Sequence, residues 1–136
     1  AFSAGALPGS ALNPVAVETL ETLGHDVSGL RPKSVAAFQG PDAPPLDFVF
    51  TVCDHAANAE LPPWPGQPMT GHWSVPDPAG ATGADADRRR AFLGAYRMLE
   101  RRIAAFAALP FDALDAVSLQ QEIDRIGVMD AAEAAG

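Results

Sequence analysis

The pattern of apolar and polar positions predicts a short buried strand near the middle of the chain. Residues 46–52 read Leu-Asp-Phe-Val-Phe-Thr-Val, with an apolar side chain at nearly every position. A run of this kind is typical of a strand that is buried on both faces, as the strands of parallel sheets are. Two further strands are predicted at residues 2–4, which Gly5 ends, and at residues 69–75.

Apolar residues that recur every three or four positions predict helices on both sides of the central strand. Asn13 is a suitable N-cap residue, Pro14 suits the first helical position, and Gly24 should end this first helix. Ser34 is expected to cap one short helical turn that runs to Phe38.

The longest helix is predicted to begin at Asp85 or Asp87 and to end before Pro110. Its apolar stripe consists of Phe92, Tyr96, Leu99, Ile103 and Phe106. Asp112 is expected to cap a last helix that Gly127 stops. The inner face of that helix would be Leu114, Val117, Ile123 and Ile126. Residues 128–136 are expected to fray.

The order strand, helix, strand, strand, helix, helix predicts a layered α/β domain over residues 1–127. A chain of 136 residues with 48% hydrophobic and 19% charged residues is typical of a single globular domain. No apolar run approaches the roughly 18 residues of a membrane span. The single cysteine favours a reducing, cytoplasmic compartment. A net charge of −8 argues against binding to nucleic acid.

Three candidate site residues follow the predicted strands. Cys53, Asp54 and Asp77 lie just past strand carboxyl ends, where parallel sheets place their working residues. Cys53 is either a small hydrophobic residue or a reactive thiol, which would need a lowered pKa. Asp77 stands between two prolines, so it either begins a turn or offers a rigidly held general acid.

The other polar and aromatic features are weaker candidates for a functional site. His25, His55 and His72 do not have the spacing of metal ligands, and no glycine-rich phosphate loop is present, so neither a metal nor a cofactor is expected. Trp64 is either a packing residue or the wall of a pocket. The arginines at positions 88–90 form either a solvated helix face or a site that attracts an anion.

Several short motifs follow one another from residue 1 to about residue 127. They are Phe2-Ser3-Ala4-Gly5, Asn13-Pro14, Leu23-Gly24, Asp-Phe-Val-Phe-Thr-Val-Cys-Asp at 47–54, Trp-Pro-Gly-Gln-Pro at 64–68, His-Trp-Ser-Val-Pro-Asp-Pro at 72–78, and Leu-Glu-Arg-Arg-Ile at 99–103. In this order the motifs are specific. The chain resembles the arsenate reductases built on the low-molecular-weight protein tyrosine phosphatase fold.

The resemblance implies a flavodoxin-like, three-layer domain in which helices flank four parallel strands. It also implies the reduction of arsenate to arsenite through a cysteine–arsenate adduct. A loop of the form Cys-x5-Arg after the first strand would hold arsenate or a phosphate-like oxyanion while the thiolate attacks it. Asp77 would then act as general acid on the leaving oxygen.

The chain departs from the family pattern at this loop. The residue six places after Cys53 is Ala59 rather than arginine, and Cys53 matches a different family position. The resemblance places the first strand and the nucleophile loop before Ala1, so we expect both to be absent from these residues. The polypeptide as written would not run the reaction. A removed N-terminal segment, another chain, or strand swapping in a dimer would complete the sheet.

The resemblance also bears on the electron donor. Family members reduced by thioredoxin use two further cysteines, which align with Cys53 and Leu61 here. Because leucine replaces the second, a thiol of the glutathione or mycothiol type is the expected donor, and Cys53 would be a bystander.

Two rival functions stay open. Phosphotyrosine hydrolysis is the first, although Ala79 and Gly80 follow the Asp-Pro pair where the phosphatases typically carry aromatic residues. This difference favours a small oxyanion as substrate. The second rival is a catalytically inactive binding module, which the missing loop supports.

Overall fold

The protein has a mixed α/β fold with three α-helices and one pair of parallel strands in the part described. The computed structural model describes the backbone of residues 1–5, 9–52 and 64–135, and side chains as far as residue 128. In chain order the elements are α1 (Pro14–Thr22), the 3-10 turn η1 (Val35–Phe38), β1 (Phe48–Thr51), β2 (Met69–His72), the 3-10 turn η2 (Pro78–Gly80), α3 (Asp85–Ala107), the 3-10 turn η3 (Phe111–Ala113) and α4 (Ala116–Ala135).

The two strands run parallel, with Phe48 opposite Met69 and Thr51 opposite His72. Both are shorter than predicted, but the hydrogen bond from Val75 N to Val52 O, 2.8 Å long, continues the pairing beyond them. The residues of β1 are half-buried rather than buried on both faces. The reason is that, among the described residues, β1 has a paired strand on one edge only.

The strand predicted at residues 2–4 is not formed. Only Gly5 pairs, in an isolated parallel bridge with Ser34. Its amide donates to Lys33 O at 2.9 Å, and Val35 N donates to Gly5 O at 3.1 Å. An extended segment needs a hydrogen-bonded neighbour along its length to become a strand, and within the described residues this segment has one only at Gly5. Phe2 accordingly remains 62% exposed.

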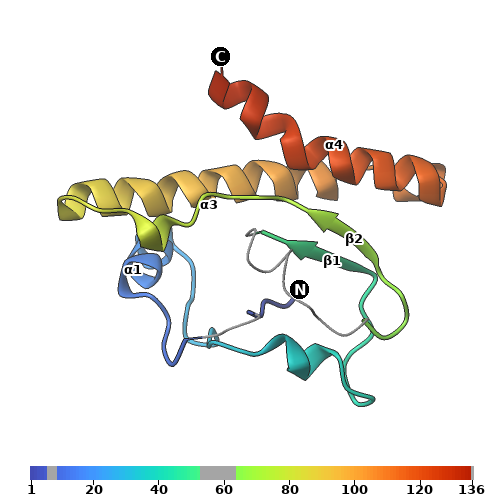
Figure 1. Cartoon of the computed structure of the whole chain (residues 1–136), viewed down its shortest axis with the longest axis horizontal. Coiled ribbons are helices and arrows are strands. Elements are labelled where there is room, and N and C mark those ends of the chain that lie inside the picture. Colours follow the sequence, from blue (N-terminus) through green and yellow to red (C-terminus); the bar gives the residue numbers. More distant parts are fainter. Residues whose placement is uncertain (6–8, 53–63, 136) are drawn as a thin grey trace.

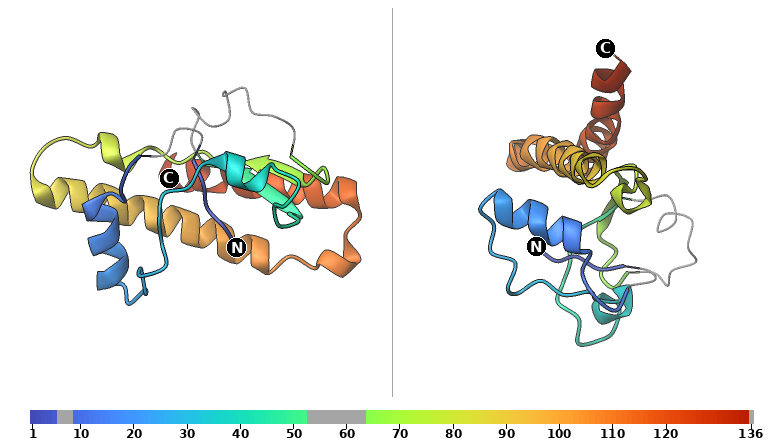
Figure 2. Two further views of the ribbon diagram at one scale, coloured as in Figure 1. Left: turned by 90° about the horizontal axis from the view of Figure 1, so that it is seen from below. Right: turned by 90° about the vertical axis from the view of Figure 1, so that its left-hand side faces the viewer.

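The long helices lie together on one side of the strand pair (Figure 1). α3 extends across the molecule, α4 lies alongside it and contacts β2, and α1 sits beside the amino-terminal part of α3 (Figures 1 and 2). The turn η2 also packs on α3. The carboxyl ends of the strands therefore point to the region enclosed by α1, α3 and η2.

The best-packed part of the core lies where α4 crosses β2. Ile123 and Ile126 are completely buried, and Trp73 is 2% exposed. The Trp73 ring stacks on Phe50 at a centroid distance of 4.0 Å, and its Nε1 donates to Ile123 O at 3.0 Å. A Cβ atom at Gly127 would lie 3.0 Å from His72 O, so the absence of a side chain there allows the close approach of α4.

The first helix is confirmed at both ends. Asn13 Oδ1 accepts a hydrogen bond from Val15 N at 2.9 Å, and Pro14 occupies the first helical position. Gly24 adopts a φ of +87° just past the helix, and the amides of Gly24 and His25 donate back to Glu21 O and Leu20 O. The capping of η1 is confirmed as well, since Ser34 Oγ accepts from Ala36 N at 3.2 Å.

The predicted ends of the last helix are wrong. Asp112 lies in η3, and Asp115 is the residue whose Oδ1 accepts from Ser118 N, at 2.7 Å, at the start of α4. Gly127 does not stop the helix, which continues to Ala135. Here the contact with Trp73 outweighs the low helix propensity of glycine.

Two residues assigned to inner helix faces are also exposed. Ile103 of α3 is 56% exposed and Val117 of α4 is 68% exposed. Helical spacing assigned more apolar residues to the inner faces than the neighbouring elements cover.

Candidate functional site

A cavity of about 400 Å³ lies at the carboxyl ends of β1 and β2. One wall comes from α1, the other from α3, and the strand ends and the η2 turn close it. The lining residues are Ala16, Thr19 and Leu20 of α1, Phe92, Ala95, Tyr96 and Leu99 of α3, and Val52, Val75, Pro76, Asp77 and Pro78. The edge of a parallel sheet where such sites are expected is therefore hollow and mostly apolar.

Asp77 is held at this cavity by the turn that it caps. Its Oδ1 accepts a hydrogen bond from Ala79 N at 2.9 Å, and its carbonyl oxygen accepts from Gly80 N at 3.2 Å. The residue has extended backbone angles, φ −70° and ψ 110°, and its side chain is exposed. The expectation that Asp77 begins a turn is confirmed, and its role as a general acid stays a prediction.

Arg102 anchors the segment that leads to Asp77. Its guanidinium is 2% exposed and donates from Nη1 to Ser74 O at 2.9 Å. Together with the bond from Val75 N to Val52 O, this contact ties the segment to α3 and to the end of β1. The apolar stripe predicted for this helix did not include Arg102. Its position three residues after Leu99 and four before Phe106 was the signal that it faces inward.

Two polar pairs lie near the same end of the strands. His25 Nε2 lies 2.7 Å from Tyr96 Oη, which links the end of α1 to α3. Desolvation of the phenol, together with the hydrogen bond and charge of Glu100, raises the pKa of Tyr96. Tyr96 therefore stays neutral at neutral pH. On the strand pair, Thr51 Oγ1 lies 2.7 Å from His72 Nδ1.

The other predicted site residues do not gather around Asp77 in the described structure. Trp64 is half-buried in a turn in which its carbonyl accepts from Gln67 N at 3.3 Å, and it does not line the cavity. Cys53 and Asp54 lie outside the described residues. Of the predicted site residues that the structure describes, only Asp77 lies at this cavity.

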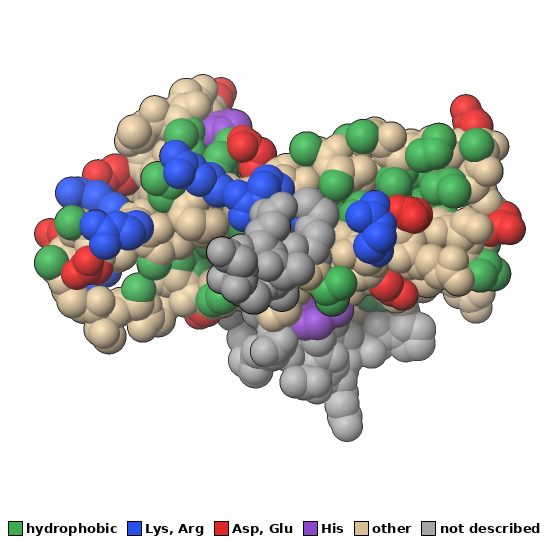
Figure 3. All heavy atoms as spheres, turned by 90° about the horizontal axis from the view of Figure 1, so that it is seen from above, with side chains coloured by type: hydrophobic (Ala, Val, Ile, Leu, Met, Phe, Trp, Pro, Cys, Tyr) green, Lys and Arg blue, Asp and Glu red, His purple; other side chains and the backbone are tan. Residues whose placement is uncertain are grey.

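The arginines at positions 88–90 lie at the start of α3 among acidic side chains. Arg89 Nε lies 3.1 Å from Glu18 Oε1, and Arg90 Nη1 lies 3.5 Å from Asp87 Oδ1. Figure 3 shows basic and acidic side chains intermingled at this end of the molecule. These pairings support the interpretation as a solvated helix face rather than an anion site.

The described residues contain no group of three or more His, Cys, Asp or Glu side chains that could hold a metal ion. Among the helices of the same residues, none is both long enough and apolar enough to cross a membrane.

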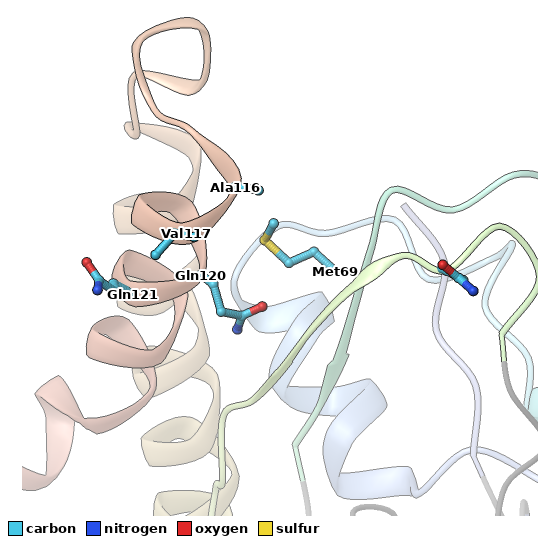
Figure 4. Close-up of a pocket in the computed structure, with 6 residues that line it drawn as sticks. Met69, Ala116, Val117, Gln120 and Gln121 are labelled. Carbon is cyan, nitrogen blue, oxygen red and sulfur yellow. The ribbon is translucent and has the colours of Figure 1, made fainter.

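A second cavity, of about 510 Å³, lies at the opposite end of the strand pair. Met69 extends from β2 toward the first turns of α4, while Gln121 points to the other side of that helix (Figure 4). Gln120 Nε2 is bonded to Thr70 O and to Asp124 Oδ1, at 2.9 and 3.0 Å. Because the described residues of its lining include no charged side chain, this cavity is a weaker candidate for a catalytic site than the one at Asp77.

Comparison with known proteins identifies no family for this chain. A scan against models of protein families finds no match, and no curated protein matches the chain.

Proposed function

We propose that this chain is the larger part of an arsenate reductase-type domain in which Asp77 is the general acid. The observation that carries the proposal is the position of Asp77. Its carboxylate is exposed, mounted on a proline-flanked turn past the end of β2, and lines the same cavity as Val52 past the end of β1. A general acid needs such a rigid mount close to the place where a substrate can sit.

The proposed fold is the flavodoxin-like, three-layer arrangement with a larger parallel sheet. The parallel pairing of β1 and β2 and the helices packed beside them support it. Asp47 O accepts a hydrogen bond from Met69 N, and Thr51 O accepts one from Trp73 N, just past β2. Because backbone groups alternate along a strand, those of Phe48 and Phe50 face the other edge of β1. A further strand could pair there, supplied by an N-terminal segment, another chain or a second copy.

In the proposed reaction a cysteine thiolate attacks As(V) of arsenate and displaces an oxygen, which Asp77 protonates so that it leaves as water. A low-molecular-weight thiol, of the glutathione or mycothiol type, then attacks the cysteine sulfur of the adduct. The sulfur–arsenic bond breaks, two electrons pass to arsenic, and arsenite and a mixed disulfide are formed. A cytoplasmic location, where such thiols are reduced, fits this chemistry.

The nucleophile and the oxyanion donors must come from a loop outside these 136 residues. Cys53 lacks the arginine six places on, and the part of the cavity lining that the structure describes contains no Lys, Arg or His. Asp77 is therefore the catalytic contribution of this chain, and Cys53 is a bystander in the proposed reaction.

The test uses the complete natural reading frame and follows arsenate-dependent oxidation of glutathione. Asp77→Asn keeps an oxygen that accepts from Ala79 N, so the turn should persist while the acid is lost. We expect kcat to fall about 100-fold or more. Asp112→Asn, in the exposed turn η3, is the matched control and should leave kcat unchanged. Equal activity of the Asp77→Asn and wild-type enzymes would refute the acid role.

Phosphate-ester hydrolysis is the second candidate, and the apolar lining of the cavity favours it. An aryl leaving group would find apolar contacts there, which arsenate would not use. Hydrolysis of p-nitrophenyl phosphate that exceeds arsenate reduction, and that also requires Asp77, would favour the phosphatase. A full-length protein without either activity would favour the inactive binding module.

A further inference from the structure

The cavity beside Asp77 has a lining that suits an organic ligand with one polar end. Among the described residues its lining is apolar in all but three, which are Thr19, Asp77 and Tyr96. Thr19 Oγ1 already donates to Val15 O at 2.8 Å, and Tyr96 Oη is paired with His25. A volume of about 400 Å³ lies within the usual range of small-molecule sites. Asp77 is therefore the polar group left to orient a ligand.

The carboxylate of Asp77 has one oxygen available. Oδ1 accepts from Ala79 N, whereas no described residue donates a hydrogen bond to Oδ2. None of the described residues that line the cavity is a lysine, arginine or histidine. The negative charge at the cavity is thus not neutralised by its own lining, and a ligand that brings a positive charge would form a charge-assisted hydrogen bond.

Two aromatic side chains strengthen the preference for a cation. Phe92 and Tyr96 lie one helical turn apart on α3, and both line the cavity. The faces of such rings attract an ammonium group. Without the oxyanion donors of the proposed loop, an anion would meet only a carboxylate and apolar walls among the described lining residues, and the net charge of −8 adds to its repulsion.

We propose that this cavity binds a small organic amine, with its ammonium group at Asp77 and its apolar body between α1 and α3. The proposal goes beyond arsenate chemistry, because the binding needs no nucleophile loop. It also has a consequence for the proposed reaction. An amine bound there would occupy the Asp77 carboxylate, so it would inhibit proton donation by Asp77.

The experiment titrates the isotope-labelled 136-residue chain with phenethylamine, 2-phenylethanol and 3-phenylpropionate, and follows amide shifts by NMR. We expect saturable binding of the amine at least about tenfold tighter than that of the alcohol, and no saturable binding of the acid. Shifts should concentrate on the amides of Ala16, Leu20 and Ala95, and ligand ring protons should show contacts to the methyl groups of Leu20 and Leu99.

Two variants and one control variant sharpen the test. Asp77→Asn should weaken the amine about tenfold, to the affinity of the alcohol, and leave the alcohol unchanged. Ala95→Leu should weaken both ligands by filling the cavity, and Asp112→Asn should change neither. Equal binding of amine and acid by the native chain, an unchanged amine affinity in Asp77→Asn, or shifts at Met69 and Gln120 would overturn the proposal. Since this binding needs no turnover, its failure and a failure of arsenate reduction are separate results.

Discussion

Where α4 crosses β2, the elements interlock closely, whereas a cavity of about 400 Å³ remains where α1 lies beside α3. In the first region Ile123 and Ile126 are completely buried, and the backbones approach across Gly127. In the second region α1 contributes no buried residue, and its ion pair, Glu18 with Arg89, is exposed to solvent. Exposed pairs of this kind contribute little to stability.

The difference separates the part of the molecule that stabilises the fold from the part that can accept a ligand. The α4 contact removes large apolar side chains from water, so most of the stability should come from it. The α1 contact buries no residue of α1 fully, and regions with few buried apolar side chains open at low free-energy cost. The candidate site lies at the contact of α1 with α3, and Asp77 is anchored to the other elements through the strand ends and Arg102.

The largest expected effect is the loss of Trp73. Trp73→Ala should lower the free energy of unfolding by about 3–5 kcal/mol, because it removes a buried ring and its hydrogen bond to Ile123 O. The matched change at the contact of α1 with α3 is Leu20→Ala, which removes a half-buried side chain that already borders a cavity. It should lower the free energy of unfolding by about 1 kcal/mol. Urea unfolding followed by circular dichroism measures both. Equal losses would contradict the comparison.

A medium effect is expected at the glycine of the close contact. Gly127→Ala would place a Cβ atom 2.9 Å from Trp73 Cδ1, and should destabilise the protein by about 1–3 kcal/mol. Gly94→Ala, in α3, meets no atom within 4 Å and should stabilise it by about 0.5–1 kcal/mol. In thermal unfolding, the Tm of Gly127→Ala should fall and that of Gly94→Ala should rise. Changes of the same sign would contradict the packing of α4 described above.

The smallest effect concerns the start of α4 and depends on pH. Hydrogen bonds from the backbone and side chain of Ser118 lower the pKa of Asp115 below its ordinary value of 3.8. Because the folded pKa is the lower one, the contribution of Asp115 to stability is fully present above the ordinary value and is lost as the pH falls through the folded pKa. Asp115→Asn should flatten this acid-side loss, and Ser118→Ala should reduce it.

The measurement for Asp115 is the free energy of unfolding at several pH values between about 3 and 6. An acid-side slope that is the same in wild type and Asp115→Asn would show that the carboxylate does not hold the helix start as described.

Local features were predictable because a few neighbouring residues decide them. Asn13 and Gly24 bound α1 as expected, and Ser34 caps η1, since each of these contacts closes within a few residues. The local sequence did not decide which aspartate caps α4, because Asp112 and Asp115 can both cap a helix and stand three positions apart. Docking of the helix decided between them.

The candidate site was predictable only in part. The position of Asp77 after a strand and between two prolines indicated an oriented carboxylate, and the structure places it on a capped turn. The walls of the cavity were not predicted, because Leu20 and Phe92 come together only when α1 docks on α3. Arg102 was missed because the stripe predicted for α3 was built from apolar side chains, and the guanidinium of Arg102 is charged.

By itself, the sequence determined the helices, the caps of α1 and η1, the two parallel strands and the turn at Asp77, since hydrophobic spacing and capping residues act over a few positions. The tertiary structure alone decided that Gly127 stays helical, that Arg102 is buried and that residues 2–4 form no strand. Each of these depends on what another element places against the residue: the Trp73 ring for Gly127, Ser74 for Arg102, and a pairing neighbour for the extended segment.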